Sequence, residues 1–176
     1  EAAKISQEYL TKIYAETYGV RSAIIRCGNY FGGYDFNFNR IIPYVIKSVV
    51  EGKKIQLRSD GTFTRDFLYI KDAVLINDLL IDRMSDSNKS FQYGSAFNFS
   101  LEIQISVVEI VKMILKLCKS DNEIEIVSNA TRETKDMFLN CDKARKELNW
   151  KPKYSLQDGL LETIQFYRSY FSKKNL

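Results

Sequence analysis

The sequence predicts a mixed α/β fold in which helices alternate with short strands. Apolar residues recur at helical spacing from Ile5 to Thr17, and a β-branched run over 20–27 follows directly. A helix followed by such a strand is typical of the end of a parallel sheet with helical crossovers. The pattern Ser106-Val-Val-Glu109 marks the start of another amphipathic helix and extends the same alternation.

The first half of the chain divides into five predicted elements. The opening helix ends before Gly19, because glycine suits the left-handed residue after a helix. We interpret Tyr9 and Tyr14 on this helix as packing residues. Pro43 fits the first turn of the second helix, and Gly52 follows its end. The elements are the opening helix, a strand over 20–27, a turn-rich loop over 28–39, a helix over 40–50 and a strand over 54–58.

The central segment predicts a strand, a tight turn, a second strand and the start of a helix. Asp60-Gly61 is the turn signal, and the strand that begins at Thr64 is expected to pair with the strand over 54–58. Asp72 is expected to cap the following helix. Arg65 lies in this otherwise apolar strand and needs an anionic partner, because a guanidinium is costly to bury alone. The partner of Arg65 is expected to be either the carboxylate of Asp66 or Asp72, or the phosphate of a ligand.

The second half contains helices with clear start signals. Ser106 and Glu109 form a predicted capping box, and Ser155 with Asp158 caps the final helix. We assign Asp142 and Trp150 to capping and packing. The predicted elements are a helix over about 72–84, a strand over 96–99, a helix over 106–118, a strand over 123–127 with one wet face, a helix over 142–148 and a final helix with Leu160, Ile164, Tyr167 and Phe171 on one side.

Composition narrows the function classes. The chain has 176 residues, 45% hydrophobic and 27% charged, which is ordinary for a globular protein. The net charge of +4 is small and dispersed and does not indicate a nucleic-acid partner. No apolar stretch approaches about 18 residues and no signal pattern opens the chain, so we expect a soluble, cytoplasmic protein without a membrane partner.

Cysteine and histidine usage limits the possible chemistry. Cys27, Cys118 and Cys141 stand alone without paired spacing, which fits a reducing compartment. The sequence has no histidine, which excludes Ser–His and Cys–His nucleophiles and the commonest zinc ligand sets, and no metal site is expected. Catalysis would therefore use Tyr, Lys, Asp, Glu, Thr or a cofactor. The sequence has no Gly-rich phosphate-binding fingerprint, so as a self-contained nucleotide-binding fold it is incomplete.

Five segments in this order resemble the C-terminal half of the extended short-chain dehydrogenases/reductases, the NAD-dependent sugar-nucleotide epimerases and dehydratases. Most relatives have Tyr-Gly-Pro where this chain has Phe31-Gly32-Gly33. That variant, with Asp35, Asn37 and the Arg-Ile-Ile-Pro run over 40–43, is most similar to the CDP-glucose 4,6-dehydratase branch. The segments are Lys4 with its helix, 26–33, 61–72 around Arg65, the 97–99 strand before a capped helix, and 142–160.

The resemblance implies a domain organisation. The fold would be the last helix and strands of a Rossmann-like parallel sheet together with a small mixed α/β substrate-binding domain. Residues 1–33 would be the remainder of the NAD-binding domain. Residues 34–176 would be mainly the substrate-binding domain, with some segments returning to the sheet. The implied cofactor is NAD, the implied ligand is a nucleotide-diphosphate sugar, and the intact enzyme is expected to be a homodimer.

The resemblance also implies roles for particular residues. Lys4 matches the lysine of a Tyr-x-x-x-Lys pair, which would make it a catalytic residue that binds the nicotinamide ribose; the tyrosine would precede residue 1. Asn29 and Arg65 match residues that contact the substrate's diphosphate. Arg40 belongs to the same substrate-binding motif. Arg132 falls where relatives place a basic residue near the phosphates, and surface solvation is the alternative for it.

The implied function is the substrate-binding half of an NAD-dependent 4,6-dehydratase that converts CDP-glucose to CDP-4-keto-6-deoxyglucose. In the family the bound NAD takes a hydride from sugar C4, water leaves across C5–C6, and the hydride returns from the cofactor to C6. The elimination acid and base and the dinucleotide fingerprint would lie before this chain, so the chain alone is expected to be inactive. The alternatives are an epimerase or other dehydratase of the same family, or a non-catalytic remnant that only binds nucleotide or partners.

Overall fold

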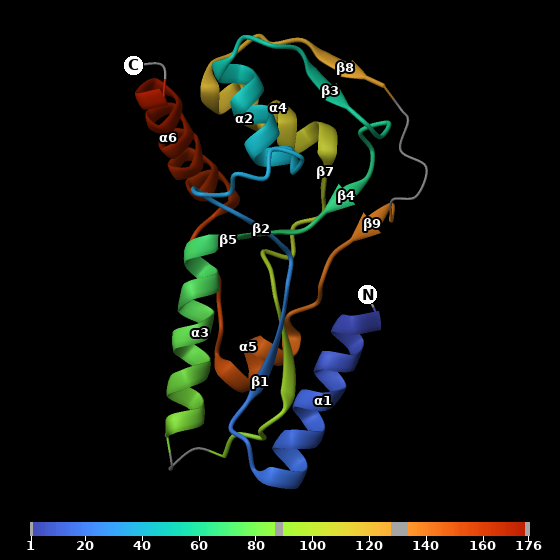
Figure 1. Cartoon of the computed structure of the whole chain (residues 1–176), viewed down its shortest axis with the longest axis vertical. Helices are drawn as coiled ribbons and strands as arrows, with labels where there is room; N and C mark the ends of the chain where they lie inside the picture. The colour runs from blue at the N-terminus through green and yellow to red at the C-terminus, as the bar shows by residue number, and fades with distance from the viewer. Residues whose placement is uncertain (1, 87–89, 128–133, 175–176) are drawn as a thin grey trace.

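A computed structural model describes residues 2–86, 90–127 and 134–174 (Figure 1). The molecule is elongated, and Figure 1 shows a lower part around α1, α3 and α5 and an upper part around α2, α4 and α6. Each part has its own apolar core. The predicted α/β class is confirmed, since helices and short, mostly parallel strands alternate along the chain.

The lower part is built on two parallel strands. β1 (Ala23–Cys27) pairs in parallel with β6 (Ser95–Phe99). Figure 1 shows α3 (Ile70–Ser85) on one side of these strands and α1 (Ala2–Tyr18) on the other, with α5 (Asp142–Leu148) beside them. Trp150 packs edge-on against Phe99 with ring centroids 5.2 Å apart, as its packing assignment predicted. The core residues here are Leu68, Ile76, Leu80, Phe97, Phe99, Cys141, Ala144, Leu148 and Trp150.

A second parallel pair connects the two parts. β2 (Asn29–Phe31) pairs with β5 (Phe67–Tyr69), so the prediction of a loop throughout 28–39 is wrong for these three residues. The Gly28 N–H donates to the Phe99 carbonyl at 3.0 Å, and the Asn29 N–H donates to the Asp66 carbonyl at 2.8 Å. A Cβ on Gly28 would lie 3.0 Å from that Asp66 oxygen. Glycine therefore lets the chain pass from the first strand pair to the second.

The upper part packs helices against short strands. Its helices are α2 (Ile41–Val50), α4 (Val107–Cys118) and α6 (Leu156–Lys174). β3 (Ile55–Leu57) pairs in parallel with β8 (Ile124–Ile126). β4 (Thr64–Arg65) lies between β7 (Ile105–Ser106), antiparallel, and β9 (Asp136–Met137), parallel. No helix among the described residues is both long enough and apolar enough to cross a bilayer.

Most local signals gave the right elements. The Ser106–Glu109 capping box is present, with the Ser106 hydroxyl accepting the Glu109 N–H. Pro43 lies in the first turn of α2, and Gly52 follows this helix at φ +64°. The predicted apolar stripe of α6 lies inward: Leu160, Ile164 and Tyr167 are buried, and Phe171 packs against the same core.

The predicted pairing of the strand over 54–58 with the Arg65 strand is wrong. Gly61 does adopt a positive φ of +85°, and the Thr62 N–H donates to Asp60 Oδ1 at 2.9 Å, so the turn itself forms. However, β3 pairs with β8 instead of β4. The predicted Arg65 strand is also interrupted at the buried Asp66, which separates β4 from β5. A turn signal fixes local backbone, whereas strand partners are chosen by the wider fold.

Four side-chain predictions are also wrong. Asp142 does not cap α5, because Cys141 occupies the N-cap position and no side-chain cap bond forms there. Asp72 does not cap α3: Tyr69 occupies the N-cap position, and Asp72 lies in the first turn. Its buried carboxylate accepts the backbone N–H groups of Lys153 at 2.9 Å and Tyr154 at 3.3 Å. Tyr9 and Tyr14 do not pack into either core, because they are 67% and 53% exposed on α1.

The strand β8 differs from its predicted alternation as well. Ile126 was expected on the dry face but is 53% exposed. The two-stranded pair that it forms with β3 leaves that end of the strand uncovered by any described element. The loop over 86–90 was predicted correctly at Asp86, where α3 has ended, while 87–89 lie outside the described residues.

Candidate functional site

A cavity of about 970 Å³ opens where β1 ends and β2 begins. Parallel sheets bind ligands at the carboxyl ends of their strands, and this cavity lies at such an edge. Lys4, Asn29, Arg40 and Arg65 all line it, although they come from different parts of the chain. Arg132 lies outside the described residues. The other lining residues are Glu8, 25–28, Tyr30, Phe31, Asp35, Phe38, Asn39, 41–44, 56–59, Phe67, Val107 and Val127.

The Lys4 wall is held by an ion pair that the sequence reasoning missed. Glu8 lies one turn after Lys4 on α1 and binds Arg26 of β1, whose Nε donates to Oε1 at 3.0 Å and to Oε2 at 3.1 Å. The hydrogen bond from Arg26, together with its charge, lowers the pKa of Glu8. An arginine in the apolar strand β1 was the available signal, the same one that singled out Arg65. The pair ties α1 to β1 at the cavity.

The floor of the cavity contains no activated thiol. Cys27 ends β1 and is partly buried, and desolvation raises its pKa to about 11. The thiol is therefore protonated at neutral pH and is a poor nucleophile. Burial also raises the pKa of the neighbouring Tyr30 hydroxyl. Asn29, which lies between them in sequence, has its backbone fixed by the bond to Asp66 and lines the cavity.

The loop before α2 forms another wall. Arg40 Nη1 donates to Asp35 Oδ2 at 3.1 Å, and Asp35 Oδ1 accepts the Asn37 N–H at 3.1 Å. Arg58, at the end of β3, donates from Nη2 to Asn39 Oδ1 at 3.4 Å. Arg58 was not nominated from the sequence, although it begins the same central segment as Arg65. Its place beside Arg40 depends on how β3 meets this loop.

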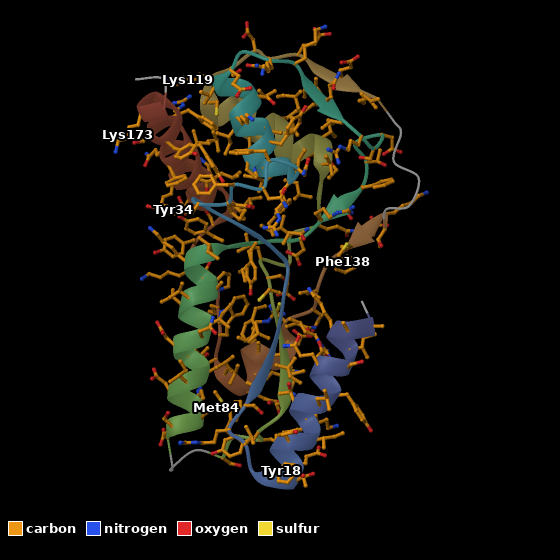
Figure 2. The ribbon with its side chains drawn as sticks, in the orientation of Figure 1. Tyr18, Tyr34, Met84, Lys119, Phe138 and Lys173 are labelled. Carbon is orange, nitrogen blue, oxygen red and sulfur yellow. The ribbon has the colours of Figure 1, made fainter. Side chains whose placement is uncertain are left out.

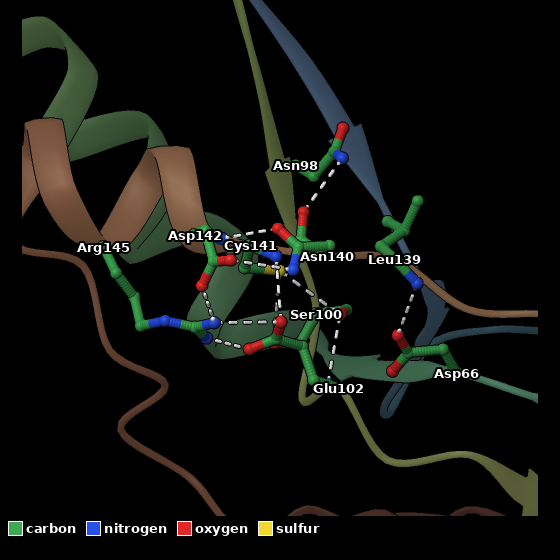
Figure 3. A network of polar contacts seen from close by, with 9 residues as sticks. All are labelled: Asp66, Asn98, Ser100, Glu102, Leu139, Asn140, Cys141, Asp142 and Arg145. Carbon is green, nitrogen blue, oxygen red and sulfur yellow. Dashed lines mark hydrogen bonds and ion pairs between the residues drawn. The ribbon is translucent and has the colours of Figure 1, made fainter.

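Arg65 is oriented by backbone carbonyls. Its Nη1 donates to the Thr64 carbonyl at 2.8 Å and to the Lys135 carbonyl at 3.0 Å. The two carboxylates that the sequence offered as ion-pair partners bind backbone N–H groups: Asp66 Oδ2 accepts from Leu139 at 3.1 Å (Figure 3), and Asp72 accepts as described above. Pairing with either carboxylate is therefore not seen among the described residues.

A polar network fastens the segment after β9 to the lower part (Figure 3). Glu102 accepts the Cys141 N–H at 2.9 Å and forms an ion pair with Arg145 of α5. Asn98 Nδ2 of β6 donates to the Asn140 carbonyl at 3.0 Å. Asp142 contributes by accepting from Arg145 Nη2 at 2.7 Å. These bonds hold this segment beside Asp66, the residue that follows Arg65.

The charges around the cavity favour an anion. Its described lining includes five basic residues (Lys4, Arg26, Arg40, Arg58 and Arg65) and two acidic ones (Glu8 and Asp35). Both acidic residues already bind an arginine, Arg26 and Arg40 respectively. A cavity with excess positive charge concentrates anionic ligands, and arginine's planar fork suits phosphate oxygens. Its volume is in the range of small-molecule and cofactor sites.

A family model and two curated relatives that match this chain are all described as sugar-nucleotide 4,6-dehydratases. A family model described as GDP-mannose 4,6 dehydratase matches residues 1–163. The dTDP-glucose 4,6-dehydratase of Shigella flexneri is 25% identical over 167 residues, covering 94% of this chain and 46% of its own length. That of Haemophilus influenzae is 26% identical over 178 residues, covering 94% and 50%. The chain thus spans about half the length of the curated relatives it matches.

Solved structures show the same fold. A dTDP-glucose 4,6-dehydratase from Bacillus anthracis, crystallised with NAD, matches with a TM-score of 0.85 and 27% identity over 97% of this chain and 52% of its own. A UDP-glucose 4-epimerase from Thermotoga maritima, crystallised with UDP-glucose, gives a TM-score of 0.86 at 23% identity, covering 97% and 53%. The Rossmann-like epimerase/dehydratase fold is therefore shown for this chain.

Proposed function

This chain belongs to the GDP-mannose 4,6-dehydratase family of extended short-chain dehydrogenases/reductases, and from that premise we propose that it forms the substrate-binding half of an NAD-dependent CDP-glucose 4,6-dehydratase. The observation that carries the proposal is the convergence of Lys4, Asn29, Arg40 and Arg65 on one basic cavity. The chain covers about half of its relatives, and the activity proposed is that of the whole protein.

The residues present fit one end of the cofactor. Lys4 lies on the wall of the cavity, on the first turns of α1 and close to the carboxyl end of β1, where a nicotinamide ribose would be accepted. Lys4 would hydrogen-bond that ribose, and its charge would lower the pKa of a hydroxyl acid/base one turn earlier. NAD, when bound, supplies reversible acceptance of a hydride from the sugar. The Glu8–Arg26 pair would keep Lys4 in place by fixing α1 to β1.

The substrate's diphosphate would lie between Asn29, Arg40 and Arg65. The two carbonyl bonds of Arg65 Nη1 hold its guanidinium at the cavity, and Asp35 holds that of Arg40. Such pre-oriented donors bind an anion without first losing side-chain entropy. We take residues 1–33 as the end of the dinucleotide-binding domain. The later segments in the lower core, α3, β6 and α5, are those we propose return to it.

The base and the reaction are proposed from the motif over 26–43. Its Gly32-Gly33 pair, Asp35 and Arg40 are the features that resemble the CDP-glucose branch. The two curated relatives described above act on dTDP-glucose, which makes thymidine the competing base. Calorimetric titration of the protein with CDP-, dTDP-, UDP- and GDP-glucose tests the choice, and we expect CDP-glucose to bind most tightly. Tighter binding of dTDP-glucose would overturn the cytidine assignment.

Product analysis tests the reaction. With NAD and CDP-glucose, we expect the protein that also contains the dinucleotide-binding half to form the 4-keto-6-deoxy sugar. Formation of CDP-galactose would instead show an epimerase. The 176-residue polypeptide alone is expected to form no product, and turnover by it would refute its assignment as a substrate-binding half. Binding of CDP without any product from the larger protein would favour the non-catalytic remnant.

We also propose a homodimer. Apolar side chains lie on the outer faces of α1, including Ile5 at 69% and Tyr18 at 70% exposure, and Ala15 is its buried residue. A helix with apolar residues on more than one outer face can pack both within its own subunit and against another copy. Analytical ultracentrifugation of the protein and of an Ile5→Glu variant tests this, with a shift to monomer expected for the variant.

A further inference from the structure

Tyr167 connects the C-terminal helix to the substrate cavity without lining it. This α6 side chain is fully buried, and its hydroxyl donates to the Asp35 carbonyl at 2.5 Å, with the Gly32 carbonyl 3.5 Å away. Burial raises the pKa of Tyr167 to about 12, so the hydroxyl remains a proton donor at neutral pH. The bond spans 132 residues of sequence and joins α6 to the loop that precedes α2.

Asp35 passes this restraint on to Arg40. While its carbonyl accepts from Tyr167, its carboxylate accepts the Asn37 N–H and the Arg40 guanidinium, both at 3.1 Å. Asp35 and Arg40 line the cavity. Because the carbonyl and the side chain share the Cα of Asp35, a carbonyl held by α6 restrains the position from which the carboxylate reaches Arg40.

The same helix shapes the rest of this loop. A Cβ on Gly33 would lie 2.8 Å from the Phe166 ring, and Phe38 packs 6.2 Å from the Tyr167 ring. Tyr34 (Figure 2) has a φ of +66°, an uncommon conformation for a bulky residue that persists only when its surroundings enforce it. Its ring lies 4.3 Å from Phe166. The loop is thus shaped by α6 before any ligand arrives.

We propose that Tyr167 is a positioning residue, which orients Arg40 for the anionic ligand through its hydrogen bond to Asp35. The proposal rests on the proposed function, in that Arg40 must contact the nucleotide diphosphate. Tyr167 itself does not touch the ligand. Its contribution is the preorganisation of a guanidinium that would otherwise have to be ordered on binding.

A double-mutant cycle on CDP affinity tests the proposal. Tyr167→Phe keeps the ring and removes the hydroxyl, and we expect it to weaken CDP binding by about 2- to 10-fold, the range of one net hydrogen bond. In an Arg40→Ala background the same change should have no further effect, because the residue that it orients is gone. A loss of packing would weaken binding equally in both backgrounds. Tyr69→Phe is the matched control: it removes the hydroxyl of a buried side chain that donates to Glu162 Oε2 at 2.8 Å and does not line the cavity, so it should leave CDP affinity unchanged.

A second variant keeps the test independent of α6 packing. Asp35→Asn leaves Tyr167 and the loop carbonyl in place but weakens the bond to Arg40. We expect it to weaken CDP binding, and this effect should likewise disappear when Arg40 is Ala. The proposal would be overturned if Tyr167→Phe had equal effects with and without Arg40. It would also be overturned if the Tyr167→Phe protein failed to fold and the Asp35→Asn variant bound CDP with normal affinity.

The Arg65→Ala variant distinguishes a failure of the positioning role from a failure of the proposed function. If Arg65→Ala weakens CDP binding but Arg40→Ala does not, the cavity binds the nucleotide and the positioning role is wrong. If neither variant weakens CDP binding, the proposed function is overturned, and the positioning role with it.

Discussion

Removal of the Arg65 guanidinium should weaken nucleotide binding strongly while leaving the fold intact. The side chain lies at the cavity with Nη1 fixed by the carbonyls of Thr64 and Lys135, at 2.8 and 3.0 Å. Charge-assisted hydrogen bonds contribute about 1.5–3 kcal/mol. Loss of that contribution corresponds to about 10- to 150-fold weaker binding. We expect Arg65→Ala to raise the Kd for CDP by this factor.

The fold should tolerate this change because β4 is held through its backbone. It pairs with β7 on one side and β9 on the other, and neither pairing needs the guanidinium. Isothermal titration calorimetry gives the Kd, and thermal unfolding verifies that the variant is folded. Arg65→Lys keeps the charge without the planar fork and should lie between wild type and Ala.

A matched control removes an arginine that also binds a carbonyl. Arg168 of α6 donates to the Cys118 carbonyl at 2.8 Å and does not line the cavity. Arg168→Ala should leave CDP affinity unchanged. A folded Arg65→Ala protein with a Kd within about twofold of wild type would refute the diphosphate role.

Three further predictions concern stability. Gly159→Ala would place a Cβ 2.8 Å from the Tyr69 ring, so we expect a loss of about 1–3 kcal/mol in urea unfolding. Ser106→Ala removes the α4 cap and should cost about 1 kcal/mol in the same assay. Hydrogen bonding to Lys71 lowers the pKa of Glu162 below its ordinary value of 4.5. Because the ionised form is favoured in the folded state, its stabilisation is present above about pH 4.5 and is lost as the pH falls. The Tm of Glu162→Gln should therefore fall less steeply on acidification than that of wild type, and parallel Tm profiles would contradict this.

Local signals in the sequence were sufficient for most element boundaries. The end of α1 before Gly19, the Ser106–Glu109 capping box and the end of α5 at Asn149 each depend on backbone conformation and hydrogen bonds within a few residues. Such interactions are the same wherever the segment lies in the fold. The resemblance also gave the fold class and residues that line the cavity, although their roles remain proposals.

Long-range partners were not predictable in this way. The partner of β3 is β8, which follows it by 69 residues, and the local turn at Gly61 gave no information about that choice. Likewise, the spacing of Asp72 suggested a helix cap, but its carboxylate binds backbone more than 80 residues away. Tyr9 and Tyr14, which are exposed, show a related limit of sequence-based prediction. Periodicity identifies the apolar face of a helix but does not show which element covers that face.

The sequence by itself determined where most helices begin and end, that histidine chemistry is excluded, and that Arg65 needed an anionic partner. Only the tertiary structure decided that Lys4, Asn29, Arg40 and Arg65 share one cavity, and that Tyr167 is bonded to the loop bearing Arg40. The physical reason is that caps and turns are stabilised by neighbours in sequence. Convergence at a site depends instead on which distant segments pack together, and that is settled by burial and hydrogen bonding over the whole chain.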